Sequence, residues 1–209
     1  VVGTANLLKL ARDRHAKSFL YISSSEVYGH PANTPTSEQD YGYLDSMNVR
    51  SCYAESKRMG ENLCVSWLHQ YGVPAKVVRL FHTYGPGMDL DDGRVYADFI
   101  KNVVRKEVIS LSSSGDSLRA FCYLGDAVAG IFRVLFLGDQ GEAYNLGSPE
   151  GEVSILNLAK KLQEMYPQRV TDVTVTEMVP KGYMASSVDR ICPDISKINQ
   201  LGWQPLTTL

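Results

Sequence analysis

The sequence predicts an α/β fold, and three observations support this prediction. Two short apolar runs, residues 18–23 and 75–81, have the length and composition of strands buried in a parallel sheet. Residues 53–71 lie between them and are rich in residues that favour a helix. A strand, a helix and a second strand in this order form a right-handed parallel crossover. The sequence therefore predicts part of a doubly wound parallel sheet.

The first predicted element is a helix over residues 3–14, in which apolar residues recur at helical spacing. The strand over residues 18–23 follows, so residues 24–29 should lie at its carboxyl end. Residues 30–48 hold two prolines and show no sustained periodicity, which predicts a loop. Because ligands of doubly wound sheets bind beyond the carboxyl ends of the strands, residues 24–29 and 82–87 are the candidate site segments.

The helix over residues 53–71 should end at Gly72 and Pro74, since glycine suits a helix cap and proline cannot continue the helix. Beyond residue 87 the pattern is mixed. The remaining predicted elements are helices over residues 96–105, 124–137 and 155–165, short strands over residues 108–111, 143–146 and 173–175, and a final turn before Gly202 and Trp203. These elements predict a smaller α+β portion after the parallel sheet.

The composition is that of an ordinary globular chain. It has 209 residues, 44% of them apolar, and a formal net charge of −2, which provides no basic field for nucleic acid. The four cysteines form no C-x-x-C pair, so we expect reduced thiols, a cytoplasmic location and no metal site. No apolar run approaches the roughly 18 residues of a membrane span. The expected partner is a small molecule rather than nucleic acid or a membrane.

Tyr53 and Lys57 carry the clearest chemical signal. They lie four residues apart at the start of a predicted helix, so their side chains share one face. A lysine ammonium beside a phenol favours the phenolate, which can take a proton from a sugar hydroxyl as hydride leaves the same carbon. Ser24 and Glu26, in the turn after the first strand, add a hydroxyl for the reacting oxygen and a carboxylate for proton transfer. This arrangement indicates alcohol oxidation.

These motifs stand in an order that resembles the extended short-chain dehydrogenase/reductase family of NAD-dependent epimerases and dehydratases, and the UDP-glucuronate decarboxylases within it most closely. The resemblance covers essentially the whole chain. The stretches that carry it are Ser23-Ser24-Ser25-Glu26-Val27-Tyr28-Gly29, Arg50-Ser51-Cys52-Tyr53-Ala54-Glu55-Ser56-Lys57-Arg58, Thr83-Tyr84-Gly85-Pro86, Asp92-Gly93-Arg94-Val95, Arg119-Ala120-Phe121-Cys122-Tyr123, Tyr144-Asn145-Leu146-Gly147, Pro193-Asp194-Ile195 and Leu201-Gly202-Trp203.

The resemblance implies a role for each matching residue. Ser24, Glu26, Tyr53 and Lys57 would be catalytic, with Tyr53 as the base. The cofactor would be NAD, held by Ser23, Tyr53, Lys57 and Thr83. The substrate would be a nucleotide sugar, with a UDP-sugar expected, and its predicted ligands are Ser25, His82, Arg94, Tyr96, Phe99 and Arg119. The arginines suit phosphate oxygens because the guanidinium fork matches their geometry.

The reaction that follows oxidation of C4 is suggested by the turn after the first strand. The family's 4,6-dehydratases place an aspartate where this chain has Ser25, and simple 4-epimerases usually lack the carboxylate that Glu26 supplies. The pattern therefore favours decarboxylation of UDP-glucuronate to UDP-xylose or its 4-keto intermediate. A 4-epimerase or a 4,6-dehydratase remains an alternative, and a non-catalytic nucleotide-sugar-binding fragment is another.

Two residues depart from the decarboxylase pattern. His82 stands where these enzymes usually have asparagine, and Ser112 stands at a usually aromatic position. His82 is predicted either to donate to a diphosphate oxygen, with a charge that depends on pH near neutrality, or to be a neutral, satisfied histidine at the strand end.

The domain organisation is predicted from the same resemblance. Residues 1–85 would form the carboxyl-terminal part of a Rossmann-type domain that carries the catalytic residues. Residues 86–209 would mainly bind the sugar nucleotide, with about residues 120–146 returning to the sheet. The glycine-rich turn that holds a dinucleotide pyrophosphate is absent from the sequence, so we expect a preceding dinucleotide-binding part and no activity without it. The resemblance also implies a homodimer, because family members pair apolar positions of the helices that match residues 3–14 and 53–71 across a two-fold axis.

Overall fold

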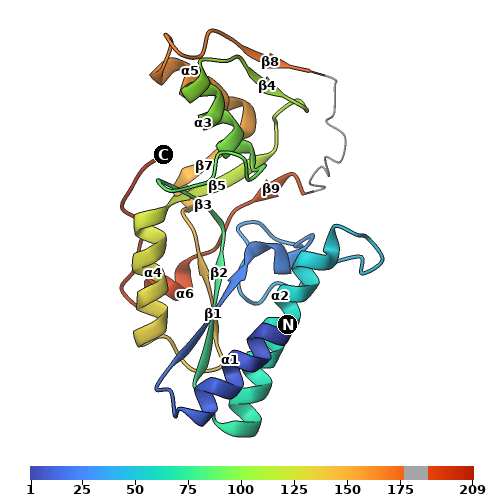
Figure 1. Cartoon of the computed structure of the whole chain (residues 1–209), viewed down its shortest axis with the longest axis vertical. Helices are drawn as coiled ribbons and strands as arrows, with labels where there is room; N and C mark the ends of the chain where they lie inside the picture. The colour runs from blue at the N-terminus through green and yellow to red at the C-terminus, as the bar shows by residue number, and fades with distance from the viewer. Residues whose placement is uncertain (177–187) are drawn as a thin grey trace.

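The centre of the molecule is a three-stranded parallel sheet. The computed structural model describes residues 1–176 and 188–209. The strands are β1 (Phe19–Ser24), β2 (Ala75–Leu80) and β6 (Ala143–Leu146), in the order β1-β2-β6 (Figure 1). The predicted α/β class with a parallel sheet is therefore confirmed.

Helices cover both faces of this sheet. Helices α1 (Val2–Asp13) and α2 (Ser51–Tyr71) lie on one face, and α4 (Leu124–Leu137) and α6 (Ser196–Asn199) lie on the other (Figure 1). Neighbouring residues of β2 serve opposite faces, because side chains alternate along a strand. Val77 packs with α1 and α2, whereas Val78 packs with α4 and α6. The result is a three-layer arrangement of helices, sheet and helices.

The carboxyl ends of the three strands meet at one edge of the sheet. Ser24 is in register with Leu80, and Leu80 is in register with Leu146. The short 3-10 helix η1 (Ser25–Tyr28) follows β1 directly, and β3 (His82–Tyr84) follows β2 after one residue. The two segments that the sequence selected as candidate sites therefore leave the sheet at the same edge.

The rest of the chain forms a smaller α+β portion beyond this edge. Its remaining elements are α3 (Val95–Arg105), β4 (Ile109–Leu111), β5 (Leu118–Tyr123), η2 (Pro149–Gly151), β7 (Glu152–Ser154), α5 (Ile155–Met165), β8 (Val173–Val175) and β9 (Arg190–Ile191). Strand β5 pairs with β3 and β9 in parallel and with β7 in antiparallel fashion. The helices predicted over residues 96–105 and 155–165 and the strands predicted over residues 108–111 and 173–175 are confirmed as α3, α5, β4 and β8. The strands β3, β5, β7 and β9 were not predicted.

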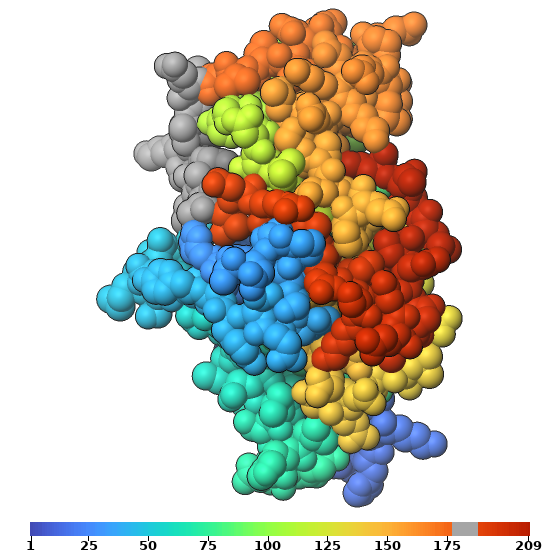
Figure 2. Space-filling view, turned by 180° about the vertical axis from the view of Figure 1, so that it is seen from behind, coloured from blue at the N-terminus to red at the C-terminus, as the bar shows by residue number. Residues whose placement is uncertain are grey.

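The loop between η1 and α2 packs against the carboxyl-terminal segment. The Thr36 N–H donates to the Cys192 carbonyl at 2.9 Å, and the Asp194 N–H donates to the Thr36 carbonyl at 2.8 Å. Figure 2 shows this loop in light blue beside the carboxyl-terminal residues in red. Segments more than 150 residues apart therefore fix each other near the edge of the sheet.

No helix within residues 1–176 or 188–209 combines the length and apolar character of a membrane span. Within the same ranges, no cluster of three or more His, Cys, Asp or Glu side chains has an arrangement suited to a metal ion.

Candidate active site

The turn after β1 is shaped by local hydrogen bonds. Ser24 has an extended backbone and caps η1, and its hydroxyl accepts a hydrogen bond from the Glu26 N–H at 3.2 Å. The turn ends at Gly29, whose φ is 58°. A Cβ at this position would lie 2.2 Å from the Tyr43 carbonyl oxygen, so the backbone approach requires glycine. Ser24 and Glu26 are thereby fixed at the carboxyl end of β1.

Helix α2 brings Tyr53 and Lys57 to the same place. Both residues lie in the first two turns of this 21-residue helix, and Tyr53 is 50% exposed. The Lys57 Nζ lies 5.6 Å from the centre of the Tyr53 ring and donates to the Ile22 carbonyl of β1 at 2.8 Å. The Arg58 Nε donates to the Val27 carbonyl of η1 at 2.7 Å. These bonds tie the start of α2 to the turn that carries Ser24 and Glu26.

Ser23 has a different environment from Ser24. It is 2% exposed, and its hydroxyl donates to the Glu61 carboxylate at 2.5 Å. This residue, predicted from the resemblance to contact the cofactor, stabilises the packing of α2 on β1 in the structure.

A second group of predicted residues lies around β3, α3 and β5. The Tyr96 hydroxyl donates to the Thr83 carbonyl at 2.9 Å, and the Thr83 hydroxyl donates to the Phe81 carbonyl at 3.1 Å. Phe99 is 3% exposed in the core between α3 and α5. Thr83, Tyr96 and Phe99 therefore shape the wall of this region through packing and backbone contacts.

The two predicted arginines differ in accessibility. The Arg94 side chain is 63% exposed and is paired with Asp92 at 2.5 Å. The hydrogen bond with Asp92 is the largest cause of the raised pKa of Arg94, and Tyr53 is close enough to contribute to it. Arg119 is 7% exposed and donates to the carbonyls of Leu118, Val188 and Asp189. Arg94 is therefore accessible to solvent, whereas Arg119 is held by backbone carbonyls.

His82 is the most unusual residue of this group. Its Nδ1 is buried and has no hydrogen-bond partner among the described residues, and its ring lies 5.7 Å from the Phe121 ring. Burial, and then the charges of Arg119 and Arg94, lower the pKa of His82 to about 4. The expected change of charge near neutrality is therefore wrong, and so is the expectation of a satisfied ring, because Nδ1 has no partner among the described residues. Donation to a diphosphate oxygen stays a prediction.

The neutral state of His82 is testable by NMR titration of its imidazole. We expect the folded protein to show no protonation of His82 between about pH 8 and pH 5.5, because its pKa is about 4 in the folded state. In the unfolded chain the pKa is about 6.5. Between about pH 6.5 and pH 4 the unfolded chain binds more protons than the folded chain, so stability from neutral His82 is present above pH 6.5 and is lost as the pH falls toward 4. His82→Asn should remove this part of the pH dependence. A His82 midpoint near 6.5 would contradict the argument.

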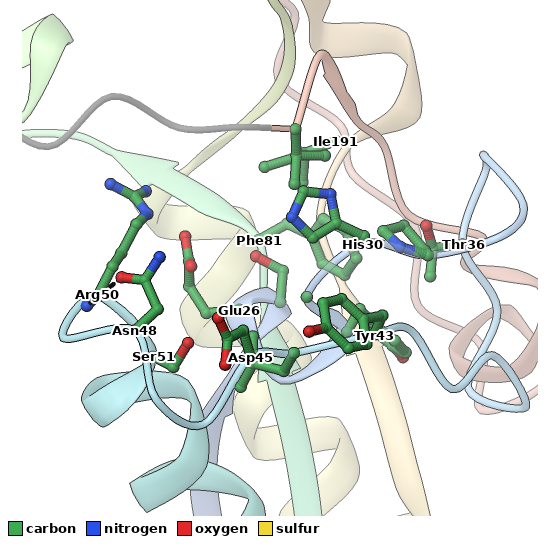
Figure 3. A pocket seen from close by; sticks show the side chains of 16 residues that line it. Glu26, His30, Thr36, Tyr43, Asp45, Asn48, Arg50, Ser51, Phe81 and Ile191 are labelled. Atoms are coloured by element: carbon green, nitrogen blue, oxygen red, sulfur yellow. Dashed lines mark hydrogen bonds between the residues drawn. The ribbon is translucent and has the colours of Figure 1, made fainter.

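A cavity of about 100 Å³ lies beside the turn. Ser25 and Glu26 line it together with residues of the loop between η1 and α2. In Figure 3 the side chains of Asn48, Arg50 and Ser51 lie on the Glu26 side of this cavity. Sequence reasoning missed the loop residues that line the cavity, among them His30, Tyr43, Asp45, Asn48 and Arg50. The available signal was a long loop directly before Tyr53, because long loops in compact domains are often functional.

Comparison with known proteins gives the family. Residues 1–147 match the NAD dependent epimerase/dehydratase family. The chain is 39% identical along its full length to UDP-glucuronic acid decarboxylase 6 of Arabidopsis thaliana and 35% identical to UDP-glucuronic acid decarboxylase 1 of Xenopus tropicalis. It spans 59% and 48% of the lengths of these relatives.

Solved structures show the same fold. The structure of UDP-glucose 4-epimerase from Thermotoga maritima with UDP-glucose has a TM-score of 0.85 at 24% identity, covering 100% of this chain and 64% of that one. A dTDP-glucose 4,6-dehydratase from Streptomyces venezuelae with bound NAD has a TM-score of 0.80 at 25% identity, covering 99% and 61%.

The parallel sheet with helices on both faces and side chains gathered at its carboxyl edge defines a Rossmann-type α/β protein. The chain belongs to the NAD dependent epimerase/dehydratase family, as the sequence motifs predicted.

NAD is the cofactor of this family, and the residues present fit one end of it. Tyr53 is half-exposed, and Lys57 lies beside it with an ammonium that can donate to ribose hydroxyls. A pyrophosphate needs backbone N–H groups at a glycine-rich turn before a helix. No G-x-x-G-x-x-G turn between a strand and a helix occurs in the described residues. This chain therefore fits the nicotinamide ribose and not the pyrophosphate.

Proposed function

We propose that the protein containing this chain oxidises C4 of UDP-glucuronate and then releases the carboxylate as CO₂. One observation carries this proposal: Ser24, Glu26, Tyr53 and Lys57 lie at one strand end, in a chain 39% identical to a UDP-glucuronic acid decarboxylase.

Oxidation is assigned to the α2 pair and Ser24. Tyr53 accepts the proton of the C4 hydroxyl, and Lys57 supplies a positive charge beside it. The Ser24 hydroxyl donates to the reacting oxygen. When bound, NAD supplies the acceptor for the C4 hydride and returns that hydride later.

Decarboxylation is assigned to the cavity beside Glu26. A ketone at C4 stands β to the carboxylate on C5, so the bond from C5 to the carboxylate carbon can break with its electron pair held as an enolate. Protonation of C5 then gives the 4-keto sugar, and Glu26 lines the cavity from which this proton is delivered. Return of the hydride to C4 gives UDP-xylose.

The nucleotide diphosphate is assigned to the group around β3 and α3. Arg94 is exposed, and the charges of Arg94 and Arg119 both act on His82. Tyr96 and Phe99 support the wall beneath them, and Ser25 lines the sugar end. The assignment of Ser23 and Thr83 to cofactor binding is part of the same proposal.

The open edge of β1 supports the expected dinucleotide-binding part. Among the described residues β1 pairs only with β2, and its Ile22 is 37% exposed. An apolar parallel strand with an unpaired edge is suited to continue a sheet. We assign this edge to pairing with the preceding half of the Rossmann-type domain. The division into a Rossmann-type part over residues 1–85 and a mainly sugar-nucleotide-binding part over residues 86–209 belongs to the same proposal.

Reconstitution tests the proposal. The chain alone should not turn over UDP-glucuronate with NAD, whereas the chain joined to a dinucleotide-binding segment of a decarboxylase relative should release CO₂ and yield UDP-xylose or its 4-keto form. The products separate the alternatives, because a 4-epimerase would return UDP-galacturonate without CO₂ and a 4,6-dehydratase would act on UDP-glucose or dTDP-glucose. A joined protein that binds UDP-sugars without any turnover would support a binding function instead.

The homodimer and the cytoplasmic location remain proposals as well. Exposed apolar side chains on α1 and α2 support self-association, and they include Val2, Leu7, Leu10, Met59 and Val65.

A further inference from the structure

The Lys57 ammonium lies between two tyrosine rings. Its Nζ is 5.3 Å from the centre of the Tyr21 ring and 5.6 Å from the centre of the Tyr53 ring. A cation within about 6 Å of an aromatic face is attracted by the ring quadrupole. Tyr21 precedes Ile22, whose carbonyl accepts the Lys57 hydrogen bond. Strand β1 therefore supplies two of these three contacts.

Gly60 provides the space that Tyr21 occupies. It lies in α2 three residues after Lys57, and a Cβ at this position would be 2.2 Å from the Tyr21 hydroxyl oxygen and 2.3 Å from the Tyr21 Cζ. Glycine is otherwise unfavourable in the interior of a helix. Its presence here lets the Tyr21 ring approach α2 closely, so Tyr21 and Gly60 form a matched pair.

The attraction comes from the neutral Tyr21 ring. Burial is the largest cause that raises the pKa of Tyr21, and Cys64 and Glu61 raise it further, while a hydrogen bond with Thr4 opposes them. Tyr21 is therefore not a phenolate that would form an ion pair with Lys57. The lysine remains available to act on Tyr53.

We infer that Tyr21, admitted by Gly60, is a positioning residue that holds the Lys57 ammonium beside Tyr53. This inference rests on the proposed function for its catalytic meaning, but the geometry is a property of the chain itself. A lysine side chain without such contacts samples many rotamers. The Tyr21 ring and the Ile22 carbonyl restrict that sampling, so the positive charge stays next to the proposed base.

NMR of this chain with ¹³C-labelled lysine tests the geometry without any activity. The Lys57 ε-methylene signal is identified by its loss in Lys57→Arg, and ring currents should shift its protons upfield. Tyr21→Phe keeps the ring and should keep the shift. Tyr21→Leu should lose most of it. Gly60→Ala should also lose it in the original chain, yet change little in the Tyr21→Leu background, where the clash is absent.

The Gly60→Ala arm keeps the test decisive if Tyr21→Leu does not fold. An unchanged Lys57 signal in either folded variant would overturn the inference. In the reconstituted enzyme, Tyr21→Leu should lower kcat by on the order of tenfold with little change in KM. Tyr21→Phe, which keeps the ring, should have the kcat of the unaltered enzyme. Absence of turnover in the unaltered enzyme would overturn the proposed function, while the NMR result would still decide the role of Tyr21.

Discussion

Replacement of Arg79 by methionine is expected to lower the free energy of unfolding by about 3–5 kcal/mol. Arg79 lies in β2 and forms an ion pair with Glu61 of α2 at 2.7 Å, and the two side chains are only 12% and 13% exposed. Without the guanidinium, the Glu61 carboxylate keeps the Ser23 hydroxyl as a partner but remains a buried charge. An uncompensated buried charge is costly, which gives the size of the effect.

The loss should extend beyond the ion pair. The Arg79 Nη1 also donates to the Tyr28 hydroxyl at 2.9 Å, and Tyr28 donates to the Asn145 Oδ1 of β6 at 2.6 Å. Burial raises the pKa of Tyr28 to about 12 although Arg79 opposes this rise, so the hydroxyl remains a neutral donor. This network connects α2, all three strands of the sheet and the turn with Glu26. Its disruption should loosen the candidate site together with the fold.

Urea unfolding followed by circular dichroism measures the effect. Arg190→Met is the matched control, because Arg190 also forms a bidentate pair with a glutamate, Glu152, but its side chain is 43% exposed. Loss of such an exposed pair should cost less than about 1 kcal/mol. The double variant Arg79→Met with Glu61→Met should recover part of the lost stability, because no buried charge is left unpaired. Similar losses for Arg79→Met and Arg190→Met would show that burial does not decide the cost.

The sequence was informative where the signal was local. The strand over residues 18–23 and the helix over residues 53–71 were recognised from apolar runs and helix formers. The parallel crossover then placed residues 24–29 and 82–87 at one edge, since parallel strands end together. The structure has these residues there, while their chemical roles remain proposals.

The sequence was uninformative where pairing is long-range. Strand β5 contains Arg119, and a charge argues against a buried strand until its partners are known. Those partners are backbone carbonyls, two of them from Val188 and Asp189 about 70 residues away. Arg79 and Glu61 were missed for the same reason, because a charged residue in an apolar run gives no sign of its partner on a helix. Phe99, predicted to contact substrate, lies in the core because α3 packs that face against α5.

Replacement of Tyr53 by phenylalanine is expected to reduce turnover of the reconstituted enzyme by about 10²- to 10⁴-fold. The substitution removes only the hydroxyl, so the ring beside Lys57 and the packing of α2 should be retained. Binding of UDP-glucuronate should change little, because the proposed diphosphate contacts come from β3, α3 and β5. The loss should therefore appear in kcat and not in KM, as expected for a group that acts on the reacting atoms.

Single-turnover formation of NADH and release of CO₂ measure the two halves of the reaction separately. Tyr41→Phe is the matched control, because Tyr41 is 89% exposed in the loop before α2 and does not line the cavity. If Tyr53→Phe kept more than about a tenth of the turnover, a different base would have to remove the C4 proton. Glu26 would then be the first candidate base, because it is the carboxylate of the proposed catalytic group and lines the cavity. Loss of both NADH and CO₂ in Tyr53→Phe, with neither lost in Tyr41→Phe, would place Tyr53 at the oxidation step, because decarboxylation depends on the C4 ketone.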